Sequence, residues 1–378
     1  MAIGIGERQL HEHQPLASDE VVNAMTLRRV QVSDFRCLHS AELEFHPHFT
    51  LISGPNASGK TSLLEALYVL GRGRSFRTRK LDHLIRSGAQ RFIVYGEAEL
   101  PERRVGLGVE GTAQGIRARM GGERVSSLGE LAAALPVQII DPEVHRLIEE
   151  GPSRRRRFLD WGVFHVEHQY VERWQRYQQV LKQRNAALKA RQARAVVAAW
   201  DVELVRLGDY LNEARMRYVA LLSASASLIA NSLLGMDLGL SYRSGWNRDQ
   251  SFAEALASSW SYDQEAGSTQ VGPQRAEIAI RLNGTPVKDR ISRGQQKLLA
   301  AALLMAQLSQ FPRDAAIRPT LLLDDPAAEL DSDRLLGLIQ EVSQQAVQLV
   351  VTSLNPEFTA FGAPGRRYSV RDGRITPV

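Results

Sequence analysis

One eight-residue loop constrains this chain more than any other stretch. Residues 54–61 read Gly-Pro-Asn-Ala-Ser-Gly-Lys-Thr, which is the pattern G-x-x-x-x-G-K-T. An apolar run at residues 49–52 precedes the loop, and leucines with helical spacing follow it between Leu63 and Leu70. The pattern therefore predicts a strand, a glycine-rich turn and a helix.

This order of elements is suited to binding phosphate. Backbone N–H groups at a helix N-terminus, together with the positive end of the helix dipole, surround an anion. Lys60 would neutralise the β- and γ-phosphates, and the Thr61 hydroxyl would bind Mg²⁺. The predicted nucleotide-binding residues of the loop are Gly54, Pro55, Asn56, Ala57, Ser58, Gly59, Lys60 and Thr61.

Length and composition set broad limits. A chain of 378 residues holds one large or two ordinary domains. The net charge of +5 suits a nucleic-acid partner, but many other soluble proteins share it. Cys37 is the one cysteine, which excludes an intramolecular disulfide and favours a reducing compartment. The longest apolar run, residues 298–308, is too short to span a bilayer, so we expect a cytoplasmic protein.

The first residues carry no regular pattern. Residues 1–24 contain scattered charge and no apolar segment of the kind found in a signal peptide. We expect a disordered extension there, with the patterned sequence beginning at Met25.

Two arginine-rich stretches are candidates for binding nucleic acid. Residues 71–80, called the basic loop below, follow the predicted helix and fit a solvated loop and a phosphate-binding loop equally well. Residues 154–157 are four arginines in the first turn of a predicted helix, where the dipole disfavours cations. An Arg156–Asp160 pair, DNA phosphate or another carboxylate would offset that charge. The predicted DNA-binding residues are Arg72, Arg74, Arg77, Arg79, Lys80, Arg154 and Arg155.

The rest of the chain alternates between strand and helix patterns. Alternating apolar residues predict two strands before residue 49, at the edge of a mixed sheet, and short antiparallel strands between 92 and 120. Two amphipathic segments within 170–221 predict a helical hairpin, and 245–267 is expected to be a polar linker. Asn283-Gly284 predicts a hairpin turn.

Two later segments complete the candidate site. Ser292 and Gln295 form a predicted capping box before an apolar helix. Residues 319–325 read as a buried strand ending in Asp324 and Asp325, and burying two carboxylates is costly unless a cation lies beside them. Asp324 fits a magnesium-linked acid, and Asp325 fits the catalytic group that orients or deprotonates the attacking water.

These motifs together resemble a known family. Their order, with A-E-L-D at 328–331 and a last strand at 347–351, is similar to the ATP-binding-cassette heads of the SMC group. From Met25 onward the chain closely resembles the RecF family of bacterial DNA recombination and repair proteins, with the runs D-F-R at 34–36, G-R-S-F-R-T at 73–78, G-P-S-R-R-R-R-F-L-D-W-G-V-F-H at 151–165 and G-P-Q-R at 272–275.

The resemblance implies a fold and a function. The fold is α/β: an ATPase head at 25–150 and 268–378, with a mixed sheet and an antiparallel β subdomain, and an inserted helical arm at 151–267. The implied function is ATP-dependent binding to DNA at gaps and single-strand/double-strand junctions, by a homodimer that forms on ATP. With RecO and RecR it would help RecA to load, and a weak DNA-stimulated ATPase activity would release the dimer.

The resemblance also implies roles for single residues. Ser292, Gly294 and Gln295 would reach the γ-phosphate of ATP held by the partner protomer. Arg36 would contact the nucleotide, and Gln138 would be a catalytic glutamine. The implied cofactors are ATP and Mg²⁺, and Thr352 stands at a position where relatives carry a switch residue.

Three positions depart from the family pattern. Ala57 replaces a glycine and requires a negative φ there, because only glycine adopts positive φ at little cost. Ala328 replaces a serine, and Gln274 stands where histidine is common. We expect ATP binding to survive these changes, with the hydrolysis rate or dimer lifetime altered.

Three other classes of protein share parts of this pattern. A chromosome-organising SMC or Rad-type ATPase would need a longer coiled coil or a C-x-x-C zinc hook. A P-loop kinase of small molecules would need a substrate pocket and a lid but no Ser292 turn. The ATPase of a transporter would have no role for arginine-rich helices.

Overall fold

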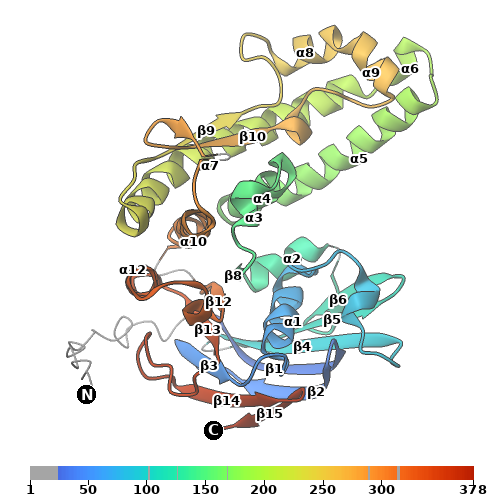
Figure 1. Cartoon of the computed structure of the whole chain (residues 1–378). Coiled ribbons are helices and arrows are strands. Elements are labelled where there is room, and N and C mark those ends of the chain that lie inside the picture. Colours follow the sequence, from blue (N-terminus) through green and yellow to red (C-terminus); the bar gives the residue numbers. More distant parts are fainter. Residues whose placement is uncertain (1–23, 101–102, 126, 168, 288–289, 313–315) are drawn as a thin grey trace. The chain divides into compact units, whose positions relative to one another are not determined.

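The computed structural model describes residues 24–100, 103–125, 127–167, 169–287, 290–312 and 316–378 (Figure 1). They form two compact units, one from residues up to Asp141 together with Pro312–Val378, the other from Pro142–Phe311. These limits differ from the predicted domain limits at 150 and 268. The second unit includes the strands and the helices that lie between residues 238 and 308.

The first unit contains an antiparallel sheet. Its order is β2-β1-β4-β5-β6-β7. The strands are β1 (Thr26–Phe35), β2 (Leu38–Glu44), β4 (Arg91–Leu100), β5 (Arg103–Thr112), β6 (Gly115–Met120) and β7 (Glu123–Arg124). The prediction that the first two strands lie at the edge of the mixed sheet was wrong, because β1 pairs with both β2 and β4.

The mixed sheet of the same unit positions the candidate site. Its order is β15-β14-β3-β13-β12-β8, and all but β15 run parallel. The strands are β3 (Phe49–Ser53), β8 (Val137–Ile140), β12 (Thr320–Asp324), β13 (Gln348–Ser353), β14 (Arg366–Arg371) and β15 (Arg374–Pro377). Every residue of β3, β12 and β13 is buried, which explains their unbroken apolar pattern. Parallel strands bring the ends of β3, β12 and β13 to one edge.

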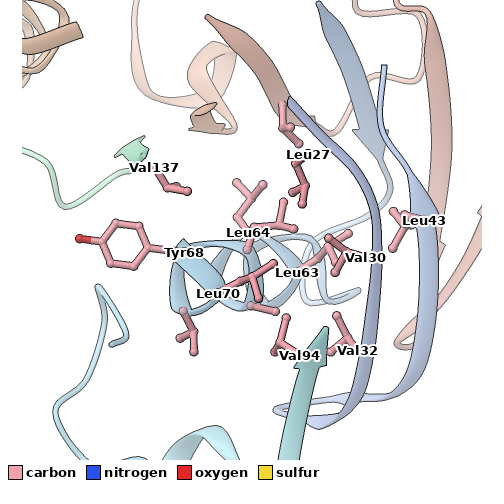
Figure 2. Close-up of a cluster of buried hydrophobic side chains, with 14 of the residues drawn as sticks. Leu27, Val30, Val32, Leu43, Leu63, Leu64, Tyr68, Leu70, Val94 and Val137 are labelled. Carbon is pink, nitrogen blue, oxygen red and sulfur yellow. The ribbon is translucent and has the colours of Figure 1, made fainter. Parts of the chain in front are cut away.

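Helix α1 (Lys60–Arg72) lies between the two sheets. It contacts β1, β4 and β5 of the antiparallel sheet and β8 and β12 of the mixed sheet. Figure 2 shows Leu63 and Leu70 of α1 among Val30, Val32 and Val94, with Tyr68 toward Val137. A helix covered on all sides is apolar around its whole circumference, which is the pattern of α1. The unit also contains η1 (Leu81–Leu84), α2 (Leu128–Ala134), α11 (Pro326–Glu329) and α12 (Ser332–Ser343).

The second unit is mainly helical. Helices α5 (Tyr170–Lys189) and α7 (Asp201–Leu234) form the predicted hairpin, with α6 (Arg194–Ala198) between them (Figure 1). Helix α10 (Arg293–Leu308) and strand β9 (Leu238–Arg243) both pack against α7. The remaining elements are α3 (Arg146–Glu149), α4 (Pro152–Val166), α8 (Phe252–Ser258), α9 (Trp260–Ala266), η2 (Pro273–Arg275), β10 (Glu277–Leu282) and β11 (Thr285–Pro286).

The predicted linker at 245–267 was wrong for most of its length, because it contains α8 and α9. Ser251 and Glu254 form a capping box at the start of α8, and Phe252 and Leu256 are buried. The hairpin turn at Asn283-Gly284 was correct, since both residues have positive φ between β10 and β11.

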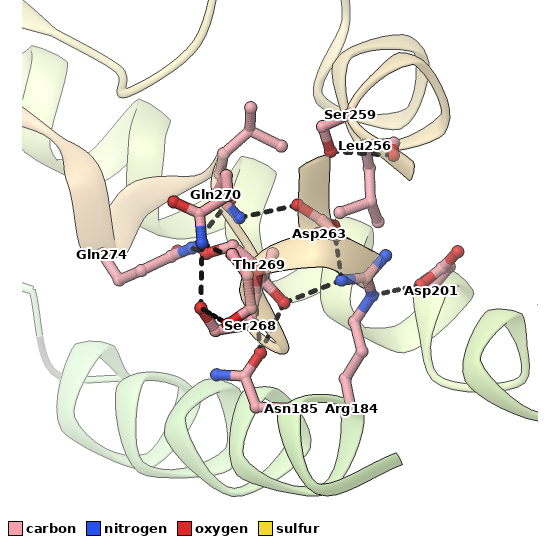
Figure 3. A network of polar contacts seen from close by, with 12 residues as sticks. Arg184, Asn185, Asp201, Leu256, Ser259, Asp263, Ser268, Thr269, Gln270 and Gln274 are labelled. Atoms are coloured by element: carbon pink, nitrogen blue, oxygen red, sulfur yellow. Dashed lines mark hydrogen bonds and ion pairs between the residues drawn. The ribbon is translucent and has the colours of Figure 1, made fainter. Parts of the chain in front are cut away.

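A buried polar network fixes the chain after α9. Arg184 of α5 is 1% exposed and donates to Asp201, Asp263 and Thr269 at 2.7 to 2.8 Å (Figure 3). The Asn185 side chain accepts hydrogen bonds from the backbone and hydroxyl of Thr269. Because buried charges are costly unless paired, this network holds the 268–270 segment against α5.

Within the described residues, 194–234 is long and apolar enough to cross a membrane by length and composition alone. This is weak evidence, because the core helix of a soluble protein passes the same test. Helix α7 buries Leu204, Leu211 and Tyr218 within its unit.

Candidate nucleotide-binding site

The loop at 54–59 joins β3 to α1 as the pattern predicts. Gly54 and Gly59 have φ of 155° and 115°, values that side chains rarely allow. A Cβ atom on Gly54 would lie 2.3 Å from the Val370 carbonyl oxygen, and one on Gly59 would lie 3.1 Å from Cys37 Sγ. Gly54 is therefore required by space as well as by backbone conformation, whereas Gly59 is favoured mainly by its backbone conformation.

Ala57 adopts a conformation that contradicts its expected backbone. Its φ is 60°, in the left-handed region, so the prediction of a negative φ was wrong. For a residue with a Cβ this conformation costs about 1–2 kcal/mol. The loop therefore bears local strain at this position.

Lys60 and Ser58 point to an anionic ligand. Lys60 Nζ donates to the carbonyl oxygens of Gly54 and Pro55 at 2.8 and 3.0 Å. Burial lowers the pKa of Lys60, partly offset by Asp325 and Asp324. The Ser58 hydroxyl is buried without a hydrogen-bond partner among the described residues. A phosphate oxygen would accept from both side chains.

Hydroxyl and carboxylate groups meet at the end of the parallel strands. Thr61 Oγ1 lies 2.8 Å from Asp324 Oδ2, and Thr352 Oγ1 donates to Asp324 Oδ1 at 2.8 Å. The backbone N–H of Asp325 donates to the Thr352 hydroxyl at 3.0 Å. The strand register explains why the Thr352 hydroxyl contacts Asp324, because these two residues pair across β12 and β13.

Asp325 follows this cluster in a left-handed conformation, with φ 46° and ψ 57°. Its charge acts on Lys60, so the two lie within electrostatic reach. The oxygen atoms of Thr61 and Asp324 are of the kind that Mg²⁺ prefers. The residues present therefore fit a nucleotide with its magnesium ion.

Arg36 lies in the turn between β1 and β2, beside the phosphate-binding loop. The next residue, Cys37, places its Sγ 3.6 Å from Ser62 Oγ in the first turn of α1. The Arg36 guanidinium is paired with Glu65 of α1 through two hydrogen bonds of 2.8 Å. Glu65 carries no obvious sequence signal, since it is a single acid inside an apolar helix, and it was not predicted as a site residue.

The backbone of Gln138 lies away from this edge of the sheet. It pairs with Leu321 in β12, three residues before Asp324, and is buried. At roughly 3.3 Å per residue this is about 10 Å along the strand from the carboxylates. Asp141, which was not predicted as a site residue, follows Ile140 directly, and Ile140 pairs with Leu323. Asp141 therefore lies at the end of the sheet where Asp324 lies. An acid directly after a buried strand is the sequence signal that could have identified it.

The residues expected to serve a partner protomer belong to the second unit. Ser292 accepts from the Gln295 backbone at 3.3 Å, and the Gln295 side chain accepts from the Ser292 backbone at 2.9 Å. The predicted capping box is therefore present at the start of α10. Ser292 is exposed and Gly294 half-buried, and their contact with a partner stays a prediction.

The basic loop carries four exposed cations. Arg74, Arg77, Arg79 and Lys80 are exposed, whereas Arg72 stacks on Tyr68 and donates to its hydroxyl at 3.2 Å. Burial lowers the pKa of Arg72 to about 10. Arg72 is thus placed to support the loop.

The four arginines of α4 are compensated by nearby acceptors. Arg154 binds Glu150, and Arg155 binds Glu277 through two hydrogen bonds of 2.8 Å. Arg156 and Arg157 donate to backbone carbonyl groups. Asp160 contacts Arg215 and Tyr170. Carboxylates other than Asp160 therefore offset much of this charge within the unit.

Comparison with known proteins places the chain in a family. The family model of the RecF/RecN/SMC N-terminal domain matches residues 26–371. The DNA replication and repair protein RecF of Aliivibrio salmonicida is 36% identical over 93% of this chain and 99% of its own length. RecF of Yersinia pestis biovar Antiqua is 38% identical over 93% and 98%.

Solved structures give the same result. A structure of the recombination mediator protein RecF with ATP, in the RecFOR pathway, has a TM-score of 0.86 and 26% identity, over 96% of this chain and 100% of that chain. An SMC head bound to the C-terminal winged-helix domain of ScpA has a TM-score of 0.56 and 18% identity, over 93% and 97%, and shows a shared fold. With an SMC-type ATPase head fold and RecF relatives along nearly its whole length, the chain belongs to the RecF family.

Proposed function

We propose that this protein is a cytoplasmic, ATP-dependent DNA-binding protein of recombinational repair. It dimerises on ATP and binds DNA at gaps and at junctions between single and double strands. It acts with RecO-type and RecR-type partners to help RecA load. Weak hydrolysis of ATP, stimulated by DNA, releases the dimer.

One observation carries the nucleotide part of the proposal. Thr61, Asp324 and Thr352 come from three segments of the chain and meet within hydrogen-bond distance at one sheet edge. Lys60 and the buried Ser58 hydroxyl lie in the loop that ends there. Such an assembly supports binding of a nucleoside triphosphate, with Mg²⁺ held by Thr61 and Asp324 to neutralise phosphate charge.

Roles for the polar groups follow from their positions. Lys60 carries the positive charge that a phosphate needs, and Asp325 lies near it as the group that orients or deprotonates water. The Ser292 turn presents a helix N-terminus on the other unit, which suits an anion on a second protomer. Two heads joined in this way each require ATP to complete the contact.

The DNA-binding part rests on the basic loop. Four of its cations are exposed, and exposed arginine and lysine side chains are suited to contact DNA phosphates. The arginines at 154 and 155 contribute less, because Glu150 and Glu277 already bind them.

Sedimentation of the protein with and without ATP and a gapped DNA duplex tests the proposal. We expect a monomer alone, a dimer with ATP, and a larger complex when DNA is added. Lys60→Met should remain monomeric under all three conditions. A monomer at saturating ATP, or a dimer that does not bind gapped DNA, would overturn the proposal.

Charge reversal tests the DNA surface separately. The triple change Arg74→Glu, Arg79→Glu and Lys80→Glu should weaken DNA binding and flatten its dependence on salt, with the slope reduced by about 0.9 for each phosphate that the variant no longer neutralises. Reversal of the three exposed arginines Arg117, Arg119 and Arg124 on β6 and β7 is the matched control and should have a smaller effect. Equal losses of affinity in both variants would place the DNA surface outside the basic loop.

A further inference from the structure

Glu65 is a buried carboxylate that the nucleotide site does not account for. It lies on α1 one turn after Thr61, and its side chain is 0% exposed. The Arg36 Nε and Nη2 atoms each donate to a separate oxygen of the carboxylate at 2.8 Å. A buried charge of this kind must remain paired, because removing its partner is strongly destabilising.

The same carboxylate also anchors the basic loop. The Ser75 hydroxyl donates to Glu65 Oε1 and accepts from the backbone N–H groups of Arg77 and Thr78 at 2.9 and 3.0 Å. Arg77 Nη1 lies 3.6 Å from Glu65 Oε2, within ion-pair range but beyond a good hydrogen bond. Arg77 is 47% exposed, whereas Arg36 is 20% exposed.

One negative charge therefore faces two arginines from two functional regions. Arg36 belongs to the turn beside the phosphate-binding loop, and Arg77 belongs to the exposed loop that we assign to DNA. If a nucleotide phosphate attracts Arg36, Glu65 is left without its principal partner and draws Arg77 inward. If a DNA phosphate attracts Arg77, Arg36 stays on Glu65.

We propose that Glu65 is a positioning residue for which Arg36 and Arg77 compete, so that nucleotide and DNA binding are coupled negatively within one protomer. The proposal rests on the proposed binding of ATP and DNA. Coupling of this kind is reciprocal, since each ligand must change the affinity for the other by the same factor. ATP-driven dimerisation adds a separate and favourable effect, which has to be removed before the coupling is measured.

The test uses the Ser292→Arg variant, which is designed to bind ATP without dimerising. Its affinity for a fluorescent gapped duplex is measured by anisotropy with and without the slowly hydrolysed analogue ATPγS. We expect the analogue to weaken DNA binding by about fivefold, a typical coupling factor. Adding Arg77→Gln to Ser292→Arg should lower the affinity for DNA. The double variant should bind DNA equally well with and without ATPγS.

Arg79→Gln provides the matched control. It removes the same charge from the same loop but lies outside the Glu65 contacts described above. It should lower DNA affinity to a similar extent and keep the fivefold effect of the analogue. Glu65→Gln, which keeps its shape and loses its charge, should abolish the effect as Arg77→Gln does.

The outcomes separate this inference from the proposed function. If the unaltered protein binds neither ATP nor gapped DNA, the proposed function fails and the inference fails with it. If Ser292→Arg binds ATP but not DNA, DNA binding requires the dimer, and only the inference of coupling within one protomer fails. If it binds both and Arg77→Gln and Arg79→Gln respond to the analogue alike, the inference is wrong while the function stands. Should Glu65→Gln not fold, the comparison of the two arginine variants decides the matter.

Discussion

Thr61 Oγ1 lies 2.8 Å from Asp324 Oδ2, although 263 positions separate the two residues. Strand β13 lies between β3, which precedes the loop before Thr61, and β12, which carries Asp324. Its Thr352 hydroxyl donates to the other oxygen of the same carboxylate. The hydroxyl also accepts the backbone N–H of Asp325. One threonine therefore positions both Asp324 and the residue that follows it.

Replacing Thr352 should separate turnover from binding. Thr352→Val removes the donor to Asp324 and leaves the Asp325 N–H without its acceptor, at a cost of about 1–3 kcal/mol in unfolding free energy. We expect ATP hydrolysis to fall more than ATP affinity, measured by phosphate release and by calorimetry. Thr352→Ser keeps the hydroxyl and should retain both. Normal hydrolysis in the valine variant would contradict this role.

ATP affinity should depend on pH through Lys60. Burial lowers the pKa of Lys60 from its ordinary 10.5, so the side chain loses its charge earlier as pH rises. Because phosphate binds the charged form, affinity should fall in this alkaline range and binding should take up a proton. A titration series from neutral pH to about pH 10 measures the fall.

Two variants identify Lys60 as the source. Lys60→Arg stays charged to above about pH 12, so its affinity should be flat over the same series while its turnover is lost. Lys60→Met should bind ATP poorly at every pH. An unchanged profile in the arginine variant would assign the titration to another group.

Ser292→Arg should block the ATP-dependent dimer without preventing ATP binding. The change also removes the capping box of α10, which costs about 1 kcal/mol. Ser251→Arg removes the equivalent capping box of α8 and controls for that loss. In the presence of ATP, light scattering should show a dimer for Ser251→Arg and a monomer for Ser292→Arg. If both variants form a dimer, Ser292 does not take part in the contact between protomers.

Ala57→Gly should stabilise the protein. Relief of the positive φ gains about 1–2 kcal/mol, and the added freedom of glycine in the unfolded chain offsets roughly 0.5–1 kcal/mol of it. A small rise in the urea midpoint is therefore expected. Ala57→Val should lower the midpoint, because a β-branched residue tolerates positive φ even less. A lower midpoint for glycine than for valine would rule out strain at this position.

Arg184 should matter far more than its neighbour Arg176. Arg184→Met leaves the buried Asp263 without its partner, which typically costs 3–5 kcal/mol. Arg176 lies on the same helix as Arg184 and forms an ion pair with Glu203 of α7 near the surface. Arg176→Met breaks this pair and should cost less than about 1 kcal/mol in unfolding free energy. Urea unfolding of the two variants provides the comparison, and similar losses would show that the Arg184 network contributes little.

Local sequence patterns predicted the parts of the site that depend on local chemistry. The glycine loop, the capping box at Ser292 and the paired acids at Asp324 and Asp325 each carry their signal within a few residues. The meeting of Thr61 with Asp324 also followed, because parallel strands end at one edge of a sheet.

Features set by long-range pairing were missed. The place of Gln138 depends on the register between β8 and β12, which its own strand does not specify. The positive φ of Ala57 is imposed by the loop around it, against the preference of alanine. Glu65 is recognised only when Arg36 and Ser75, from segments before and after α1, are seen around it.

Helix α7 gives its unit a mechanical property. Its 34 residues form a rod of about 51 Å at 1.5 Å per residue. Because α10 packs on α7, a displacement that begins at Ser292 is passed to a stiff lever. A tilt of ~5° about one end of a rod of this length moves the other end by about 4 Å. A small rearrangement at the Ser292 turn would thus become a movement large enough to make or break a contact at the far end of the hairpin.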